Sequence, residues 1–113
     1  MWLATKFGFY SIVQKQAPKD GKPAVFHVRA RVRKDLENLI TATALQKEIQ
    51  EWKNADYRYR IIVGQQEVTE IMAHLAESLD YDNFKSMIGN TPDQRAKLHG
   101  YHEIWGVMMD LQK

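Results

Sequence analysis

"FHVRARVRK", residues 26–34, carries the pattern from which both the fold and the candidate site are inferred. Apolar and polar residues alternate along it, as in a strand with one face on a core and the other face toward solvent. The apolar positions are Phe26, Val28, Ala30 and Val32. The polar positions are His27, Arg29, Arg31 and Arg33. We therefore predict a strand over residues 24–33 with a strongly basic outer face.

Two further segments have the composition of strands. Residues 2–15 are rich in aromatic and β-branched residues and include Gly8, so we expect a strand that is bent or bulged at this glycine. The turn signal Pro-Lys-Asp-Gly, residues 18–21, joins it to the basic strand in a β-hairpin. A third strand over residues 56–63 directs Arg58, Arg60 and Ile62 to one face and Tyr57, Tyr59, Ile61 and Val63 to the other.

Apolar residues at helical spacing predict helices in the rest of the chain. A short helix follows the basic strand over the segment KDLENLI, residues 34–40. A capping-box pattern at Thr43 and Gln46 predicts a further helical stretch up to Trp52. Another helix begins after Gly64, with an apolar stripe formed by Val68, Ile71, Met72, Leu75 and Leu79.

The C-terminal third is also expected to be helical. The segment DYDNFKSMIG, residues 80–89, predicts a short helix or turn. Thr91, Pro92 and Gln94 then have the residue types of the N-cap, N1 and N3 positions of a longer helix. We expect this helix to run to about Leu111 and to bury Tyr101, Ile104, Trp105, Met108 and Leu111.

The order of these elements, β-β-α-β-α-α, predicts an α+β fold. A small antiparallel sheet with helices on one face is the natural architecture for it, and a loosely ferredoxin-like arrangement is one option. The length of 113 residues fits a single α+β domain over residues 1–113. The sequence does not determine the strand order.

Composition and charge exclude several classes of protein. The chain has no cysteine, which excludes disulfides, thiolate catalysis and cysteine-based zinc sites and agrees with a cytoplasmic location. No apolar run approaches the roughly 20 residues of a membrane span, and the N-terminus lacks the features of a signal peptide. The formal net charge is +2, but residues 1–40 carry eight Lys/Arg against three Asp/Glu, whereas residues 41–113 carry eight against eleven. A local basic surface is therefore expected on a nearly neutral molecule.

The basic strand face is the first candidate site. If helices cover the apolar face, a set of polar and aromatic side chains is left on the open face, namely Lys6, Tyr10, His27, Arg29, Arg31, Arg33, Arg58 and Arg60. Sheets that bind single-stranded nucleic acid combine aromatic rings for the bases with arginines for the phosphates. Two other interpretations stay open. The charges can simply keep an exposed strand from aggregating, or they can meet an acidic protein partner or a second copy of the chain.

The segment DYDNFK supplies a second candidate site. It consists of Asp80, Asp82, Asn83 and Lys85, to which His102 on the last helix can be added. The spacing is not that of a calcium-binding loop, and Asp80 or Asp82 as the N-cap of the next helix explains it without a ligand. His99 and His102 are three residues apart, unlike the zinc-binding HExxH pattern, so no metal or cofactor is expected.

Five segments of the chain, taken in order, resemble a group of small bacterial proteins of uncharacterised function. The segments are MWLATKFGFYS, VRAR, DYRYR, DYDNFK and YHEIW. DYDNFK is the most specific of them, and the group's pattern has phenylalanine at Tyr10 and often proline at Arg58. The resemblance implies a bacterial protein of one domain and implies no activity or site residue.

We expect a binding module without catalytic chemistry, whose basic face engages an anionic partner such as single-stranded RNA or DNA. A protein-interaction module or homodimer is the alternative. The second alternative is a small enzyme that uses His102 with Asp80 or Asp82.

Overall fold

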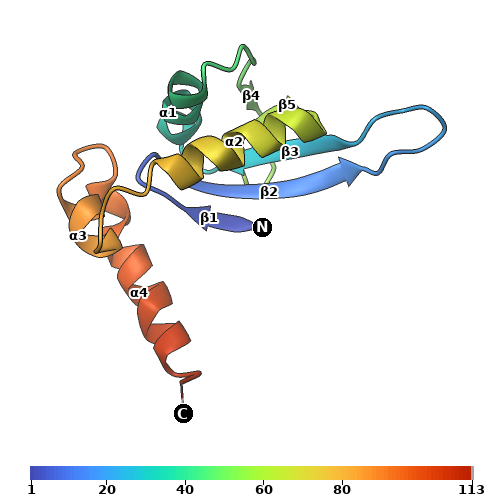
Figure 1. Cartoon of the computed structure of the whole chain (residues 1–113). Coiled ribbons are helices and arrows are strands. Elements are labelled where there is room, and N and C mark those ends of the chain that lie inside the picture. Colours follow the sequence, from blue (N-terminus) through green and yellow to red (C-terminus); the bar gives the residue numbers. More distant parts are fainter. Residues whose placement is uncertain (113) are drawn as a thin grey trace. The chain divides into compact units, whose positions relative to one another are not determined.

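The computed structural model describes residues 1–112, which form two compact units that divide after Leu79. The first unit contains β1 (Trp2–Ala4), β2 (Phe9–Gln16), β3 (Val25–Ala30), α1 (Arg33–Thr43), β4 (Gln50–Glu51), β5 (Tyr59–Val63) and α2 (Gln65–Glu77) (Figure 1). The second contains α3 (Phe84–Gly89), the 3-10 helix η1 (Arg95–Lys97) and α4 (Leu98–Met109). A single domain over residues 1–113 stays a prediction.

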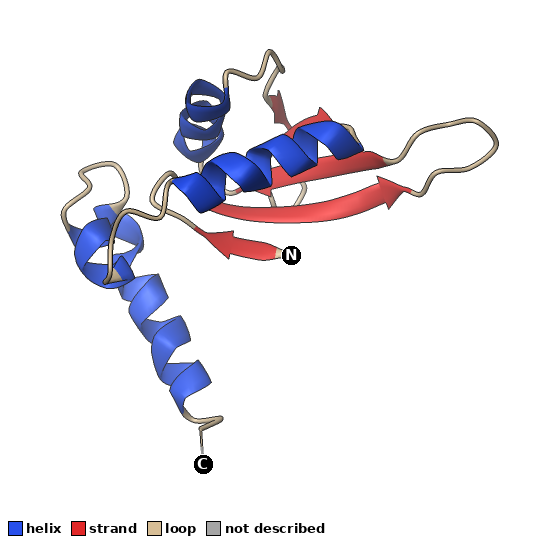
Figure 2. Cartoon of the chain, viewed as in Figure 1, coloured by secondary structure: helices blue, strands red, loops and turns tan. Residues whose placement is uncertain are grey.

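The first unit is a five-stranded antiparallel sheet with the strand order β1-β2-β3-β5-β4. Helices α1 and α2 lie over the same face of this sheet (Figure 2). The predicted α+β class is confirmed, and α1 and α2 share one face of the sheet as predicted. The predicted strand over residues 2–15 is instead a hairpin of two strands, and β4 was not predicted.

The core forms between one sheet face and the two helices. Ile12, Val28 and Ile61 are paired across β2, β3 and β5, and each is at most 6% exposed. The helices meet them with Leu36, Leu39, Ile71 and Leu75. The alternation of FHVRARVRK therefore has its predicted parity up to Ala30, with Val28 and Ala30 in the core, but the strand ends there and Val32, which was predicted on the buried face, is 43% exposed.

The β1–β2 turn is joined to α1 at Gly8 and Asp35. The Thr5 hydroxyl donates to the Gly8 carbonyl at 2.9 Å, and the Asp35 carboxylate accepts from the Phe9 N–H at 3.1 Å. The Tyr10 hydroxyl donates to the backbone carbonyl of Asp35. Tyr10 is fully buried as a result, so its predicted position on the open face was wrong.

Two predicted helical segments were also wrong. The stretch between Thr43 and Trp52 is not helical, because α1 ends at Ala44 in the left-handed conformation (φ 56°) and the chain continues into β4. The last helix begins at Leu98 rather than near Thr91. The Thr91 hydroxyl donates to the Met87 carbonyl at 2.8 Å, so it closes α3 instead of capping a new helix.

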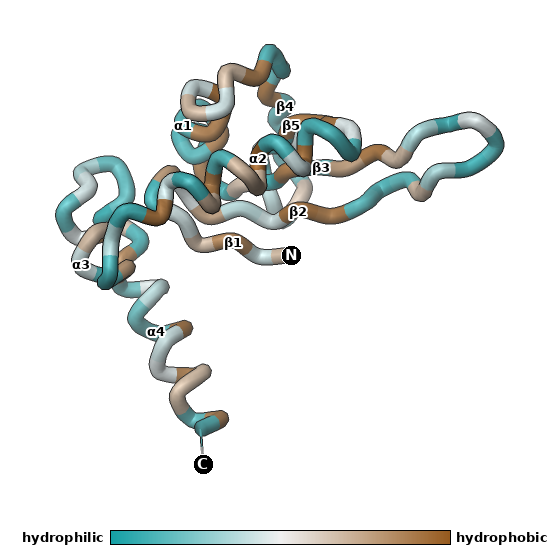
Figure 3. Tube along the Cα trace, in the orientation of Figure 1, coloured by the Kyte–Doolittle hydropathy of each residue, from teal (hydrophilic) through white to brown (hydrophobic). Residues whose placement is uncertain are grey.

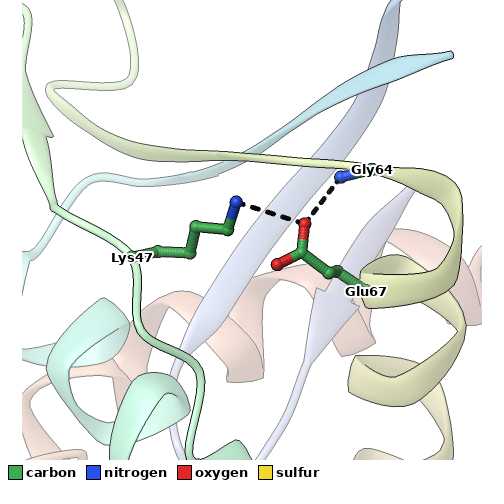
Figure 4. Close-up of polar contacts among 3 residues, drawn as sticks. All are labelled: Lys47, Gly64 and Glu67. Atoms are coloured by element: carbon green, nitrogen blue, oxygen red, sulfur yellow. Dashed lines mark hydrogen bonds and ion pairs between the residues drawn. The ribbon is translucent and has the colours of Figure 1, made fainter. Parts of the chain in front are cut away.

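The start of α2 is fixed by a local polar contact. The Gly64 N–H donates to Glu67 Oε1 at 2.9 Å, and Lys47 Nζ lies 3.3 Å from the same oxygen (Figure 4). Glu67 thereby satisfies a backbone donor that the first turn of the helix would leave unpaired. It also ties the segment after α1 to the beginning of α2.

Replacing Gly8 with alanine should destabilise the first unit. The added Cβ would lie 2.4 Å from Cβ and Cγ of Asp35, whose side chain is fixed by its own hydrogen bonds. We expect a loss of about 1–3 kcal/mol in the free energy of unfolding, typical of overpacking, measured by urea denaturation. Gly64→Ala is the control, because its nearest neighbour would be 3.9 Å away. A smaller loss for Gly8→Ala than for Gly64→Ala would contradict the close approach of Gly8 to Asp35.

Candidate basic and aromatic site on the outer sheet face

The sheet face opposite the helices carries a row of side chains that crosses all five strands. Trp2 pairs with Ser11, Ser11 with Arg29, Arg29 with Arg60, and Arg60 with Gln50. His27 lies in the next row of the same face, between Val13 and Ile62. Since side chains alternate along a strand, these residues share the outer face.

The segment between β4 and β5 folds back over this face. The guanidinium carbon of Arg60 lies 3.8 Å from the centre of the Trp52 ring. Those of Arg29 and Arg31 lie 4.6 and 4.4 Å from the centre of the Tyr57 ring. We call His27, Arg29, Arg31, Trp52, Tyr57 and Arg60 the cation–aromatic array.

Hydrogen bonds fix the inner members of the array. Arg60 donates to the Tyr57 carbonyl at 3.1 Å and to Nδ1 of His27 at 3.1 Å, and Arg29 donates to the Ser11 hydroxyl at 2.7 Å. Because the guanidinium can only donate, Nδ1 of His27 accepts, and a neutral His27 carries its proton on Nε2. Arg60 is only 3% exposed, so it is a structural cation of this face.

The array holds more positive charge than its surroundings neutralise. Among residues 1–112, no carboxylate forms an ion pair with Arg29, Arg31 or Arg60. The buried Nε atoms of Arg29 and Arg60 also have no hydrogen-bond partner within the described residues. A face with this arrangement favours the approach of an anion.

The pKa values of two members respond to this charge. Burial is the largest cause that lowers the pKa of His27, and the charges of Arg60, Lys15 and Arg29 add to it. Burial and then the charge of Arg29 lower the pKa of Arg60, although Asp56 acts in the opposite direction. Both lowered pKa values mean that this face makes the protonated, positively charged forms of His27 and Arg60 less favourable than they are in water.

The accessible surface around the array is aromatic and basic. Trp2 is 71% exposed and meets Phe9 edge-on, with 6.1 Å between ring centres. Trp52 is 42% exposed, and Arg31 lies beyond the end of β3 with its side chain toward solvent. A ligand on this face would therefore meet Trp2, Trp52 and Arg31 first.

The structure brings together half of the residues predicted for this site. His27, Arg29, Arg31 and Arg60 are in the array, whereas the predicted residues Lys6, Tyr10, Arg33 and Arg58 are not.

The other four residues have separate environments. Lys6 lies in the β1–β2 turn with its amine 5.7 Å from the Phe7 ring centre, and Tyr10 is in the core. Arg33 begins α1 rather than ending the strand, and its Nε lies 3.6 Å from Glu37, one turn along the helix.

Arg58 is paired with a carboxylate on the neighbouring strand. Its Nη2 lies 2.6 Å from Glu51 Oε2, and its Nε donates to the same oxygen at 2.8 Å. The hydrogen bond to Arg58 lowers the pKa of Glu51, and the same contact raises the pKa of Arg58. This pair neutralises a charge that the sequence alone assigned to the basic face.

Trp52 and Tyr57 were missed as members of the site. Trp52 was assigned to a helix and Tyr57 to the apolar face of a strand, because their apolar character fits both patterns. The signal that points to their position is the polar stretch Lys53–Asp56 between them, whose composition is typical of a turn. A turn there lets both rings fold back over the outer side of β3 and β5.

The second unit contains a separate polar pocket. It is lined by Lys85, Ser86, Gly89, Asn90, Leu98, His99 and His102, and neither Asp80 nor Asp82 is among these residues. Lys85 Nζ lies 3.4 Å from His102 Nδ1 and 4.4 Å from the centre of the Trp105 ring. Asn83, rather than Asp80 or Asp82, is the N-cap of α3, since its side-chain oxygen accepts from the Ser86 N–H at 2.9 Å.

Comparisons with known proteins add no assignment: no family model matches the chain, and neither curated proteins nor solved structures give a significant match. Within the described residues, no helix has the length and apolar character needed to cross a membrane. No group of three or more His, Asp or Glu side chains in this part of the chain is arranged to hold a metal ion.

The lowered pKa of His27 predicts a pH dependence of stability. The unfolded chain takes up a proton near the ordinary histidine pKa of 6.5, whereas the folded chain does so only at lower pH. The contribution of His27 to stability is therefore complete above pH 6.5 and falls on acidification through that value, by at most about 1.4 kcal/mol per pH unit for one proton. Urea denaturation between about pH 7.5 and 5, where carboxylates as a rough rule stay ionised, measures the slope.

Two histidine variants make the assignment specific. His27→Gln should flatten this slope, and His74→Gln should keep it, since His74 is an exposed residue on α2. An unchanged slope in His27→Gln would show that another group is responsible.

Proposed function

We propose that the outer sheet face of the first unit binds single-stranded nucleic acid. The observation that carries the proposal is the cation–aromatic array, in which three guanidinium groups stack on two aromatic rings without a carboxylate partner among residues 1–112. Elsewhere on the first unit, Arg33 and Arg58 are each paired with a glutamate. Here the missing negative charge is left for a ligand to supply.

Two features favour a nucleic acid among anionic ligands. Trp2 and Trp52 are exposed to 71% and 42%, and flat rings of this kind stack on unpaired bases. Arg31 lies close to Tyr57 with its outer side in solvent, so it is available to a phosphate. Alternating rings and cations match the alternation of bases and phosphates along a strand.

A single strand fits this face better than a duplex. In a duplex the bases are stacked on one another, and protein aromatic rings reach them only after they are unstacked. Single-strand binders instead use an open sheet with aromatic platforms and a positive groove. The face of this sheet opposite α1 and α2 has aromatic platforms and positive charge, and none of the described residues of the first unit forms a helix on it.

The members of the array have different roles in this proposal. Arg60 and Arg29 hold the loop and Tyr57 in place and contribute positive potential from below the surface. Trp2, Trp52 and Arg31 make the direct contacts. Removing an inner arginine would disturb the fold, so the accessible residues are the ones to test.

The proposal is binding rather than catalysis. The six residues of the array contain no carboxylate, and His27 is 8% exposed with Nδ1 occupied by Arg60. A general acid or base has to reach the reacting atom within hydrogen-bond distance. Nothing in the array meets that requirement.

Replacing Arg31 with alanine should weaken binding and reduce its salt dependence. Fluorescence anisotropy of a labelled mixed-sequence RNA and a single-stranded DNA, at several salt concentrations, measures both quantities. Losing one phosphate contact should lower the slope of log K against log salt by about 0.7. Arg33→Ala is the matched control, because Arg33 lies two residues away and is paired with Glu37 on α1. If Arg31→Ala and Arg33→Ala changed the affinity and its salt slope equally, the nucleic acid would not be bound specifically at the outer sheet face.

Replacing Trp2 with alanine tests the stacking part of the proposal separately. Loss of one base–aromatic stack should cost about 1–3 kcal/mol in binding free energy, with the salt slope unchanged. Trp2 is mostly exposed, so thermal unfolding should show little change in stability. If polyglutamate competes as well as RNA and Trp2→Ala binds like wild type, the partner is an acidic protein and the nucleic-acid proposal fails.

A further inference from the structure

Helix α4 of the second unit leaves most of its apolar side chains uncovered. Tyr101 is its one buried residue among those described. The exposed ones are Ile104 at 45%, Trp105 at 49%, Val107 at 67%, Met108 at 59%, Met109 at 45% and, just after the helix, Leu111 at 77%. The sequence predicted burial of four of these, and within this chain that prediction was wrong. Figure 3 shows the hydrophobic colouring along the C-terminal half of α4.

The sequence of this helix half is that of a buried helix. From Ile104 to Met109 no residue is charged, whereas a solvent-facing helix places charged or polar residues on its outer side. A contiguous apolar patch of this size on a folded domain marks an interaction surface. The helix therefore requires a cover that the described residues of the second unit do not provide.

The uncovered side chains lie on a regular stripe. Tyr101, Ile104, Met108 and Leu111 follow one another at spacings of three, four and three residues, the pattern of core positions in packed helix pairs. Phe84 of α3 covers the beginning of this stripe, with 4.9 Å between its ring centre and that of Tyr101. The rest of the stripe, which we call the α4 stripe, consists of Ile104, Val107, Met108 and Leu111.

The neighbouring side of α4 has its own contacts. Trp105 stacks on His102 with 5.8 Å between ring centres, and Lys85 Nζ lies 4.4 Å from the Trp105 ring. Met109 lies one turn beyond Trp105 on that side. Trp105 therefore has contacts within the second unit although it stays 49% exposed, and the α4 stripe lies beside it on the helix.

We propose that two copies of the chain associate through the α4 stripe. The four side chains of the stripe are 45–77% exposed, and a pairing through them is smaller than the standard interface of roughly 800 Å² on each partner, so the dimer should form only as the concentration rises. The stripe contains no charge that would select an unlike partner. A two-fold axis lets the same apolar side chains face each other, and a helix with three-four spacing is complementary to itself.

The side-chain types in the stripe suit such a pairing. Methionine adapts its shape to an opposing surface, and Met108 stands beside the branched residues Ile104 and Val107. This inference does not rest on the proposed nucleic-acid binding, which concerns the first unit.

Analytical ultracentrifugation of the full chain over a wide concentration range tests the proposal. We expect the mass to rise from one chain to two with concentration and then to stay constant. Ile104→Glu should raise the dissociation constant by roughly tenfold or more, because it places a charge in the centre of the stripe. Met109→Glu is the matched control. Both side chains are 45% exposed on the same helix, but Met109 lies off the stripe.

The outcomes separate specific pairing from unspecific association. Dimerisation that Ile104→Glu abolishes and Met109→Glu preserves supports the proposal, provided that circular dichroism shows both variants to be as helical as wild type. A single-chain mass at every concentration overturns it. Equal loss in both variants, or masses that grow beyond two chains without a limit, also overturn it, because they indicate that apolar surface alone drives the association.

Discussion

The burial of Arg60 is the constraint on which the outer sheet face depends. A guanidinium that is 3% exposed and has no ion-paired carboxylate among the described residues loses most of its hydration. Removing a charge from water costs several kcal/mol even after the protein relaxes. Stacking on Trp52, worth about 2 kcal/mol when desolvated, and two hydrogen bonds offset part of this cost.

The loop between β4 and β5 takes its position from the same requirement. The Tyr57 carbonyl has to reach Arg60, and this brings the Tyr57 ring between Arg29 and Arg31. The sheet face is therefore covered by a layer of rings and cations rather than left bare. An outer layer built in this way keeps its positive charge, because aromatic rings attract cations without neutralising them.

The sequence predicted the parts of the fold that depend on local periodicity. The alternation in β3 has its predicted parity, because a period of two identifies the buried face of a strand wherever helices cover only one side. The apolar stripe of α2 is likewise buried at Ile71 and Leu75. Errors arose where a contact distant in the sequence decides the conformation. The bend at Gly8 was predicted, but its division of the segment into two strands, with the Gly8 backbone packed against Asp35 27 positions along the chain, is not contained in the local pattern.

The candidate site was predictable to the same extent. The two-residue alternation of side chains along a strand correctly placed His27, Arg29 and Arg60 on one face, since all three lie within strands. It failed for Arg33, where the strand had already ended and α1 had begun, and for Arg58, whose charge is met by Glu51 from β4. Trp52 and Tyr57 could not be assigned to the site from the sequence. The alternation of apolar and polar residues does not distinguish an aromatic side chain in the core from one that stacks on a surface arginine.

The two proposed surfaces would bind chemically different partners. The cation–aromatic array has aromatic contacts for its cations but lacks anions, whereas the α4 stripe consists of apolar side chains without an apolar cover. Added salt screens phosphate contacts and reduces the gain from counterion release on binding, so it weakens association at the first surface. It leaves apolar association intact, and salts such as sulfate strengthen it. Ionic strength therefore weakens association at the first surface and not at the second, because one attraction is between charges and the other arises from water.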